Sequence, residues 1–129
     1  MPSQGRRGSA LVATAVALVC LSLVLNFEVA QARIYTVGGA KGWTFGVHKW
    51  PGRKQIFRAG DILVFNYAAK QHNVVVVNKA GYRSCNAPAN AKGYWTGNDH
   101  VKLVKGRNFF ICSFPGHCKA GMRIVVTAK

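Results

Sequence analysis

The chain has 129 residues and carries 18 Lys and Arg against 3 Asp and Glu, which gives a formal charge of +15 and a pI of about 10.4. This length allows one domain at most. Half of the residues are hydrophobic and 11% are aromatic. This composition excludes a disordered basic tail, because such tails lack the apolar surface that offsets the loss of chain entropy on folding.

The first 32 residues are predicted to be a secretory signal peptide. Arg6 and Arg7 precede an apolar run of 16 residues from Ala10 to Leu25, and Ala30-Gln31-Ala32 has the small-x-small pattern of a cleavage site. A membrane anchor is the alternative, but the run is shorter than the roughly 20 residues that span a bilayer. Cleavage leaves one domain, residues 33–129, with a formal charge of +14.

This domain is predicted to be all-β, of the sandwich or barrel type. Runs rich in β-branched and aromatic residues recur along it, bounded by Gly, Asn, Pro or Lys. No amphipathic run of helical period exceeds two turns, and only residues 80–86 are expected to form a short helical turn. The expected strands, in chain order, are Ile34–Val37, Asp61–Tyr67, Asn73–Asn78, His100–Val104, Asn108–Phe114 and Met122–Thr127.

The cysteine count leaves one thiol without a partner. Cys20 is removed with the signal peptide, and the domain keeps Cys85, Cys112 and Cys118. Secreted proteins normally pair their cysteines, so one disulfide and one free thiol are expected. The count alone does not say which cysteine is free.

A metal-binding pattern lies near the C-terminus. Cys112, His117 and Met122 follow one another at intervals of five residues, in a Gly- and Pro-containing segment that is expected to be a loop. A thiolate, an imidazole and a thioether form a soft donor set that selects copper. His72, just before a predicted strand, is the candidate for a second imidazole, which would complete a His₂Cys plane with Met122 as the axial ligand.

Each of these residues also has an interpretation without a metal. A Met at the start of a strand is usually in the core, a single His is usually on the surface, and a free Cys usually packs as a small apolar group. Three such coincidences within one loop are less convincing than one site. Zinc is the alternative metal, although a thioether is a poor zinc ligand. His48 and His100 lack comparable partners and are expected on the surface.

The high charge does not indicate a nucleic-acid-binding protein. The basic residues are dispersed, and no recognition helix or zinc-finger spacing accompanies them. They form either a solvated basic surface or one that attracts an acidic polysaccharide or an acidic redox partner. With only Asp61 and Asp99 as acids in the domain, hydrolase chemistry based on a Ser-His-Asp triad or on paired carboxylates is not expected.

From Arg33 to Lys129 the sequence resembles the phytocyanin family of cupredoxins. The resemblance implies a Greek-key β-sandwich that holds one type 1 copper ion. It implies His72, Cys112, His117 and Met122 as copper ligands and a disulfide between Cys85 and Cys118, which makes Cys112 the free thiol. The motifs that carry it are Ile34–Gly39, Gly42–Phe45, Phe57–Asp61, Asn66-Tyr67, His72–Asn78 and Cys112–Met122.

The resemblance also implies a function. The protein is expected to be a monomeric one-electron carrier rather than an enzyme, with electrons passing at the His117 edge beside Phe114 and Pro115, and with Asn73 linking the two ligand segments. Its redox donor and acceptor are not named by the sequence. The chain stops at Lys129 without an apolar tail, so release into the extracellular space or cell-wall matrix is expected, with no membrane anchor. The alternative is a matrix-associated signalling or binding protein in which copper is structural or dispensable.

Overall fold

The computed structural model describes residues 12–22 and 31–129. They belong to two units that divide after Gln31. Residues 12–22 are helical, and their side chains are exposed. Among the described residues, no helix has both the length and the apolar character that a membrane crossing needs. The predicted cleavage motif begins at Ala30, which lies outside the described residues.

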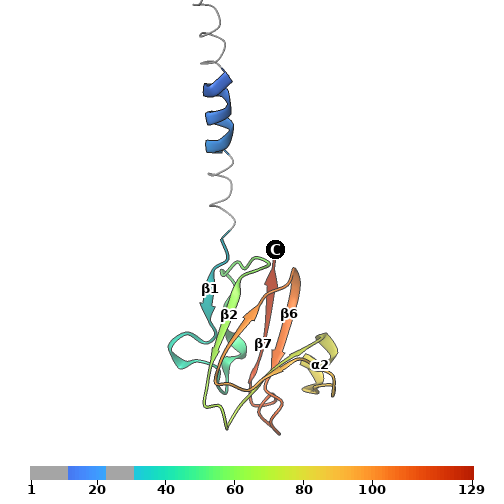
Figure 1. The fold of residues 1–129 in the computed structure, drawn as a ribbon. Coiled ribbons are helices and arrows are strands. Elements are labelled where there is room, and N and C mark those ends of the chain that lie inside the picture. Colours follow the sequence, from blue (N-terminus) through green and yellow to red (C-terminus); the bar gives the residue numbers. More distant parts are fainter. Residues whose placement is uncertain (1–11, 23–30) are drawn as a thin grey trace, which may run out of the picture. The chain divides into compact units, whose positions relative to one another are not determined.

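Residues 32–129 form two β-sheets (Figure 1). The first sheet has three strands in the order β1-β2-β5, with β1 parallel to β2 and β2 antiparallel to β5. The second has four antiparallel strands in the order β4-β3-β6-β7. The strands are β1 (Ile34–Thr36), β2 (Ile62–Asn66), β3 (Val74–Val77), β4 (Gly93–Tyr94), β5 (Asn98–Lys102), β6 (Gly106–Ile111) and β7 (Arg123–Ala128).

Three short helices connect the strands. The 3-10 helices η1 (Gly39–Lys41) and η2 (Val47–Lys49) lie between β1 and β2, and α2 (Lys79–Ser84) follows β3. Helix α2 begins where the Asn78 side chain accepts a hydrogen bond from the Gly81 N–H. It ends at Cys85, which adopts the left-handed conformation with φ of 55°.

The main core lies between the two sheets. It contains Leu63 and Phe65 from β2, Phe110 from β6 and Ile124 from β7, each at most 1% exposed. Because side chains alternate across a strand, Val74 points into this core while Val75 points to the other face of its sheet. There Val75 packs in a second apolar cluster with Ile111 and Cys118, against α2 and the loop after it.

The prediction of an all-β, two-sheet cupredoxin-like fold with short helical turns is confirmed. The strand predicted to run to Phe114 ends at Ile111, because the chain turns at Cys112 into the ligand loop. The strand predicted from His100 begins at Asn98. Strand β4 is only two residues long and had no sequence pattern to reveal it. His48 and His100 are exposed, as expected.

Candidate metal centre

His72 and Asn73 are held buried at the start of β3. The backbone N–H of His72 donates to the Ala68 carbonyl across a turn, at 3.3 Å. His72 is 6% exposed and Asn73 is 2% exposed. The Trp43 indole N–H donates to the Asn73 carbonyl at 2.9 Å, which fixes the backbone beside His72 against the core.

The loop from Cys112 to Met122 is curled by its own backbone. The Cys112 N–H donates to the Met122 carbonyl at 3.0 Å, and the Met122 N–H donates to the His117 carbonyl at 3.1 Å. Segment 44–48 packs on this loop, with the His48 N–H donating to the Gly121 carbonyl. Gly121 has φ of 94°, and a Cβ there would lie 2.9 Å from the Gly46 backbone, so glycine is required at this contact.

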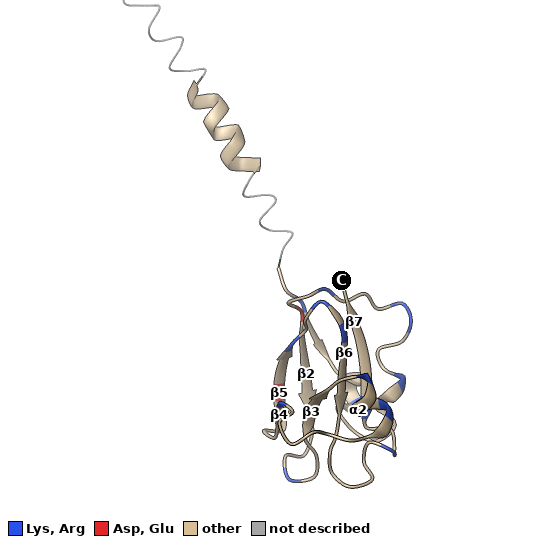
Figure 2. Ribbon diagram, turned by 90° about the vertical axis from the view of Figure 1, so that its right-hand side faces the viewer, with Lys and Arg blue, Asp and Glu red and all other residues tan. Residues whose placement is uncertain are grey.

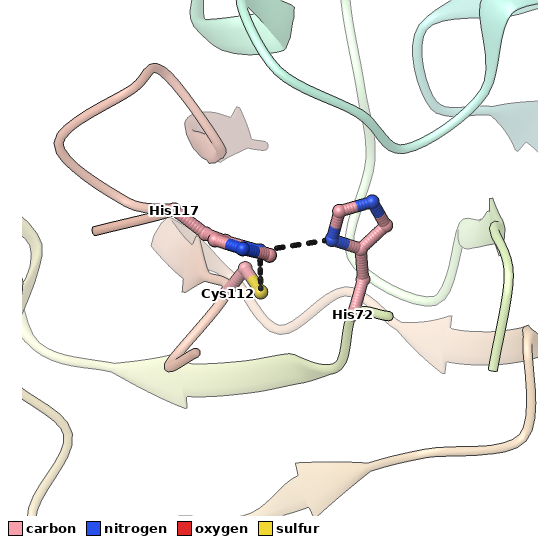
Figure 3. Close-up of side chains that lie close together, drawn as sticks. All are labelled: His72, Cys112 and His117. Carbon is pink, nitrogen blue, oxygen red and sulfur yellow. Dashed lines mark hydrogen bonds between the residues drawn. The ribbon is translucent and has the colours of Figure 1, made fainter. Parts of the chain in front are cut away.

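The two segments bring three donor side chains to one point (Figure 3). The Nδ1 atoms of His72 and His117 are 3.0 Å apart, and the Cys112 Sγ is 3.6 Å from the His117 Nδ1. The donor atoms of the three residues all lie within 4.8 Å of one another. Among the described residues, this is the only group of three or more His, Cys, Asp or Glu so arranged.

Burial shifts the pKa values of two of these residues, His72 and Cys112, before any metal binds. It lowers the pKa of His72 below the ordinary 6.5, with a further contribution from the neighbouring His117. It also raises the pKa of the Cys112 thiol, against the opposing effect of hydrogen bonds from the backbone of Asn73 and Phe114. The His72 imidazole is therefore neutral at pH 7 and can bind a cation directly, whereas the Cys112 thiol must first lose its proton.

Asn73 joins the two ligand segments directly. Its side-chain amide donates to the Ser113 Oγ at 2.7 Å, and its side-chain oxygen accepts from the Ser113 N–H at 2.8 Å. Ser113 follows Cys112 and Asn73 follows His72, so one amide group holds the distance between the two donor-bearing segments.

The predicted disulfide between Cys85 and Cys118 is confirmed, with an S–S distance of 2.06 Å. It connects the end of α2 to the residue after His117. Cys112 is buried with a free thiol. In residues 31–129 the odd cysteine is therefore the one that faces the two imidazoles.

Met122 is fully buried, and its backbone is bonded to both Cys112 and His117. It also belongs to the main core cluster. Its role as the axial ligand remains a prediction.

Phe45 is a site residue that the sequence did not reveal. Its ring is 51% exposed and packs edge-on against the rings of His72 and His117, at centroid distances of 5.3 and 4.8 Å. Phe114, which belongs to the same loop as His117, also packs on the His117 ring, at a centroid distance of 5.6 Å. Phe45 lies 27 positions before His72, and no spacing rule connects it to the Cys-His-Met pattern.

The chemistry of this donor set fits copper. Cu(II) accepts imidazole and thiolate, Cu(I) favours sulfur, and the three side chains offer both kinds of donor in a buried setting.

Comparisons with known proteins agree with this geometry. A profile of the plastocyanin-like domain family matches residues 43–122, which is more than half of the chain. The chain belongs to this family. Among its plastocyanin-like relatives, it is 58% identical over 95 residues to a basic blue protein of Cucumis sativus, covering 74% of this chain and 98% of the relative. It is 50% identical over 121 residues to a chemocyanin of Lilium longiflorum, covering 94% of this chain and 95% of the relative.

Two solved plastocyanin-like structures share the fold. The cucumber basic protein, a blue copper protein, has a TM-score of 0.72 and 56% identity, covering 74% of this chain and 99% of that one. Spinach plantacyanin has a TM-score of 0.66 and 52% identity, with the same coverage. The predicted resemblance to phytocyanins is thereby confirmed, and within them the chain is similar to the plantacyanins or basic blue proteins.

Proposed function

We propose that this protein is a type 1 blue copper protein that carries single electrons, with His72, Cys112, His117 and Met122 as its copper ligands. The observation that carries the proposal is the convergence of two imidazoles and a free thiol within 4.8 Å, in a chain whose relatives are blue copper proteins. Copper, when bound, supplies a one-electron couple between Cu(I) and Cu(II).

The protein's own contribution is to hold the donors. The Asn73 hydrogen bonds and the Cys85–Cys118 disulfide fix both segments, so the ligand positions change little between oxidation states. Four protein ligands leave no position for a substrate, which favours electron transfer over catalysis at the metal.

Electrons would enter and leave at the partly exposed His117. Phe45 and Phe114 both pack on its ring, and the exposed Pro115 follows Phe114 in the loop. These side chains form an apolar rim through which a redox partner could approach without displacing charged groups.

The test is the colour of the protein. Reconstitution with Cu(II) is expected to give an intense thiolate-to-copper absorption band, and Cys112→Ser is expected to abolish it together with most of the copper affinity, because the thiolate supplies both the transition and the softest bond. His100→Gln is the control, since His100 is exposed and lies outside the group of three donors, and it should leave the band unchanged. An undiminished band in Cys112→Ser would remove Cys112 from the site and with it the proposal.

Binding to an anionic extracellular matrix is a second candidate function. Both carboxylates of residues 31–129, Asp61 and Asp99, are buried. Asp61 accepts hydrogen bonds from the backbone N–H groups of Arg33 and Arg58, and Asp99 accepts from Tyr67 and Thr96. No Lys or Arg of residues 31–129 is buried, and these residues occur on several parts of the ribbon (Figure 2), so the exposed side-chain charges of this part of the chain are all positive. Such a surface attracts polyanions and acidic proteins.

A further inference from the structure

We propose that the pocket beside Trp95 binds uronic-acid units of an anionic polysaccharide. This proposal rests on the matrix-binding candidate above, for which it names a site and a ligand class. None of the four proposed copper ligands lines the pocket, so binding does not require the metal to be present. The pocket lies between Trp95 of the segment after β4 and the loop that follows α2.

Trp95 is held as a flat, exposed platform. Its side chain is 57% exposed, although tryptophan usually buries its large apolar surface. The six-membered ring of the indole lies directly on Gly93, where a Cβ would come within 2.2 Å of the ring. Gly93 does not have a left-handed φ. The absence of a side chain at position 93 is therefore needed by the ring and not by the backbone.

The space beside this platform has the size and lining of a small-ligand site. The pocket measures about 370 Å³, within the ~300–1,000 Å³ range of known ligand pockets. The loop after α2 lines the pocket with small apolar side chains, and Asn86 and Ser113 contribute polar groups. The apolar lining residues of the loop are Ala87, Pro88, Ala89 and Ala91. The Ser113 Oγ accepts from Asn73, which leaves its O–H proton to be donated to a ligand.

Two exposed basic residues lie close in the chain to residues that line the pocket. Lys92 is exposed and lies in the chain between Ala91 and Gly93, which both line the pocket, and its Nζ is 5.4 Å from the centre of the Tyr94 ring. Arg83 is exposed on α2, two positions before Cys85, which also lines the pocket. The buried Asp61 and Asp99 place no negative charge at this surface.

A uronic-acid unit matches these three features together. One face of a pyranose ring presents C–H groups, which pack on an aromatic ring, while its hydroxyls need hydrogen-bonding partners and its carboxylate needs a cation. Trp95 and the pair Asn86 and Ser113 line the pocket and supply the first two. Lys92 is not a lining residue, but it is the exposed cation next in the chain to two lining residues, Ala91 and Gly93, and it is the candidate partner of the carboxylate. A single-stranded nucleic acid fits less well, because its successive bases need several stacking platforms, and this pocket has one.

The test is calorimetric titration of the copper-loaded protein with a galacturonic-acid oligomer of defined length, at low and at physiological salt. Wild type should bind, more weakly at the higher salt. Trp95→Ala should weaken binding by about tenfold or more, since it removes the stacking contact. Gly93→Ala should also weaken it, although the indole is retained, because the new Cβ displaces the ring. Ile56→Ala is the matched control, since it truncates another exposed apolar side chain, 59% exposed, and should bind like wild type.

A charge-matched pair separates the pocket from the general surface. Lys92→Gln and Lys54→Gln remove the same charge, and Lys92→Gln should weaken binding more. The blue absorption band confirms that each copper-loaded variant is folded, and circular dichroism does so for copper-free Cys112→Ser. Equal losses in this pair, or unchanged binding in Trp95→Ala, would overturn the pocket while leaving attraction to the basic surface in place.

Equal affinity for a single-stranded oligonucleotide, also dependent on Trp95, would overturn the assignment to uronic acids. Binding that persists in copper-free Cys112→Ser would support a site independent of the metal, and its loss there would overturn that independence.

Discussion

His72 and His117 present their Nδ1 atoms to each other at 3.0 Å, with the Cys112 sulfur 3.6 Å from the latter. This arrangement is held by hydrogen bonds at the residues that follow two of the donors: Trp43 bonds to the Asn73 carbonyl, and the Asn73 side chain bonds to Ser113. Single substitutions at the donors should therefore change the metal's properties more than they change the fold.

Met122→Gln should keep copper bound but lower its reduction potential. An amide oxygen is a harder donor than a thioether and favours Cu(II) over Cu(I). Voltammetry resolves a modest change, since each tenfold shift in relative affinity for the two oxidation states moves a one-electron potential by about 59 mV. If Met122 acts only as a core residue, the variant loses stability and its potential stays where it was. An unchanged or raised potential would thus contradict its role as the axial ligand.

The stability of the copper-free protein should fall as the solution becomes acidic. Burial lowers the pKa of His72 below 6.5, so on acidification the unfolded chain takes up this proton before the folded one does. The contribution is fully present above about pH 6.5 and is lost as the pH falls toward the folded-state pKa. Urea denaturation of copper-free wild type and His72→Gln across this range measures it. The variant should show a smaller decrease, and an equal decrease in both would contradict the assignment to His72.

At the scale of elements, the Cys85–Cys118 disulfide connects α2 to the ligand loop across a separation of 33 residues. Two constraints therefore act on the same loop, since its backbone is also closed by the hydrogen bonds between Cys112, His117 and Met122. Helix α2 covers the outer face of β3 and β6, where Val75 and Ile111 pack with Cys118.

Replacing both cysteines of the disulfide by serine should lower the free energy of unfolding by about 3–4 kcal/mol, from the loss of the constraint on the unfolded chain. Copper should recover part of this loss, because it binds only the folded site. Denaturant unfolding of the double variant with and without copper gives both numbers. An unfolding free energy equal to that of wild type in the copper-free state would contradict this account.

The sequence predicted those elements whose residues follow a simple pattern. The run of four valines at 74–77 indicated β3, and the five-residue intervals of Cys112, His117 and Met122 indicated one loop. Strand β4 could not be found, because its two residues pair only once β3 is in place. Phe45 was missed for the same reason. Its contact with both imidazoles depends on how segment 44–48 packs on the ligand loop, which is a tertiary property.

At the scale of the whole molecule, the predicted division into a signal peptide and one secreted domain has a direct test. Expression of the full chain in a secretory cell should release a protein whose first residue is Arg33. The disulfide is consistent with an oxidising compartment. Ala32→Tyr is the control, since it places a large residue before the cleavage point and should block processing. Recovery of the uncleaved chain from the medium of wild-type cells would contradict the prediction.

Ser113 belongs to two structures at once. Its Oγ and its N–H are hydrogen bonded to Asn73 between the copper-ligand segments, and the same residue lines the pocket beside Trp95. We therefore expect a ligand in that pocket to be thermodynamically coupled to the oxidation state of the metal, and such coupling is reciprocal. An anionic sugar beside Ser113, the residue after Cys112, would favour Cu(II), so the oxidised protein would bind the sugar more tightly than the reduced one by the same factor. Reduction of the copper would then weaken binding to the polysaccharide, and the reduction potential of the matrix-bound protein would be lower than that of the protein in solution.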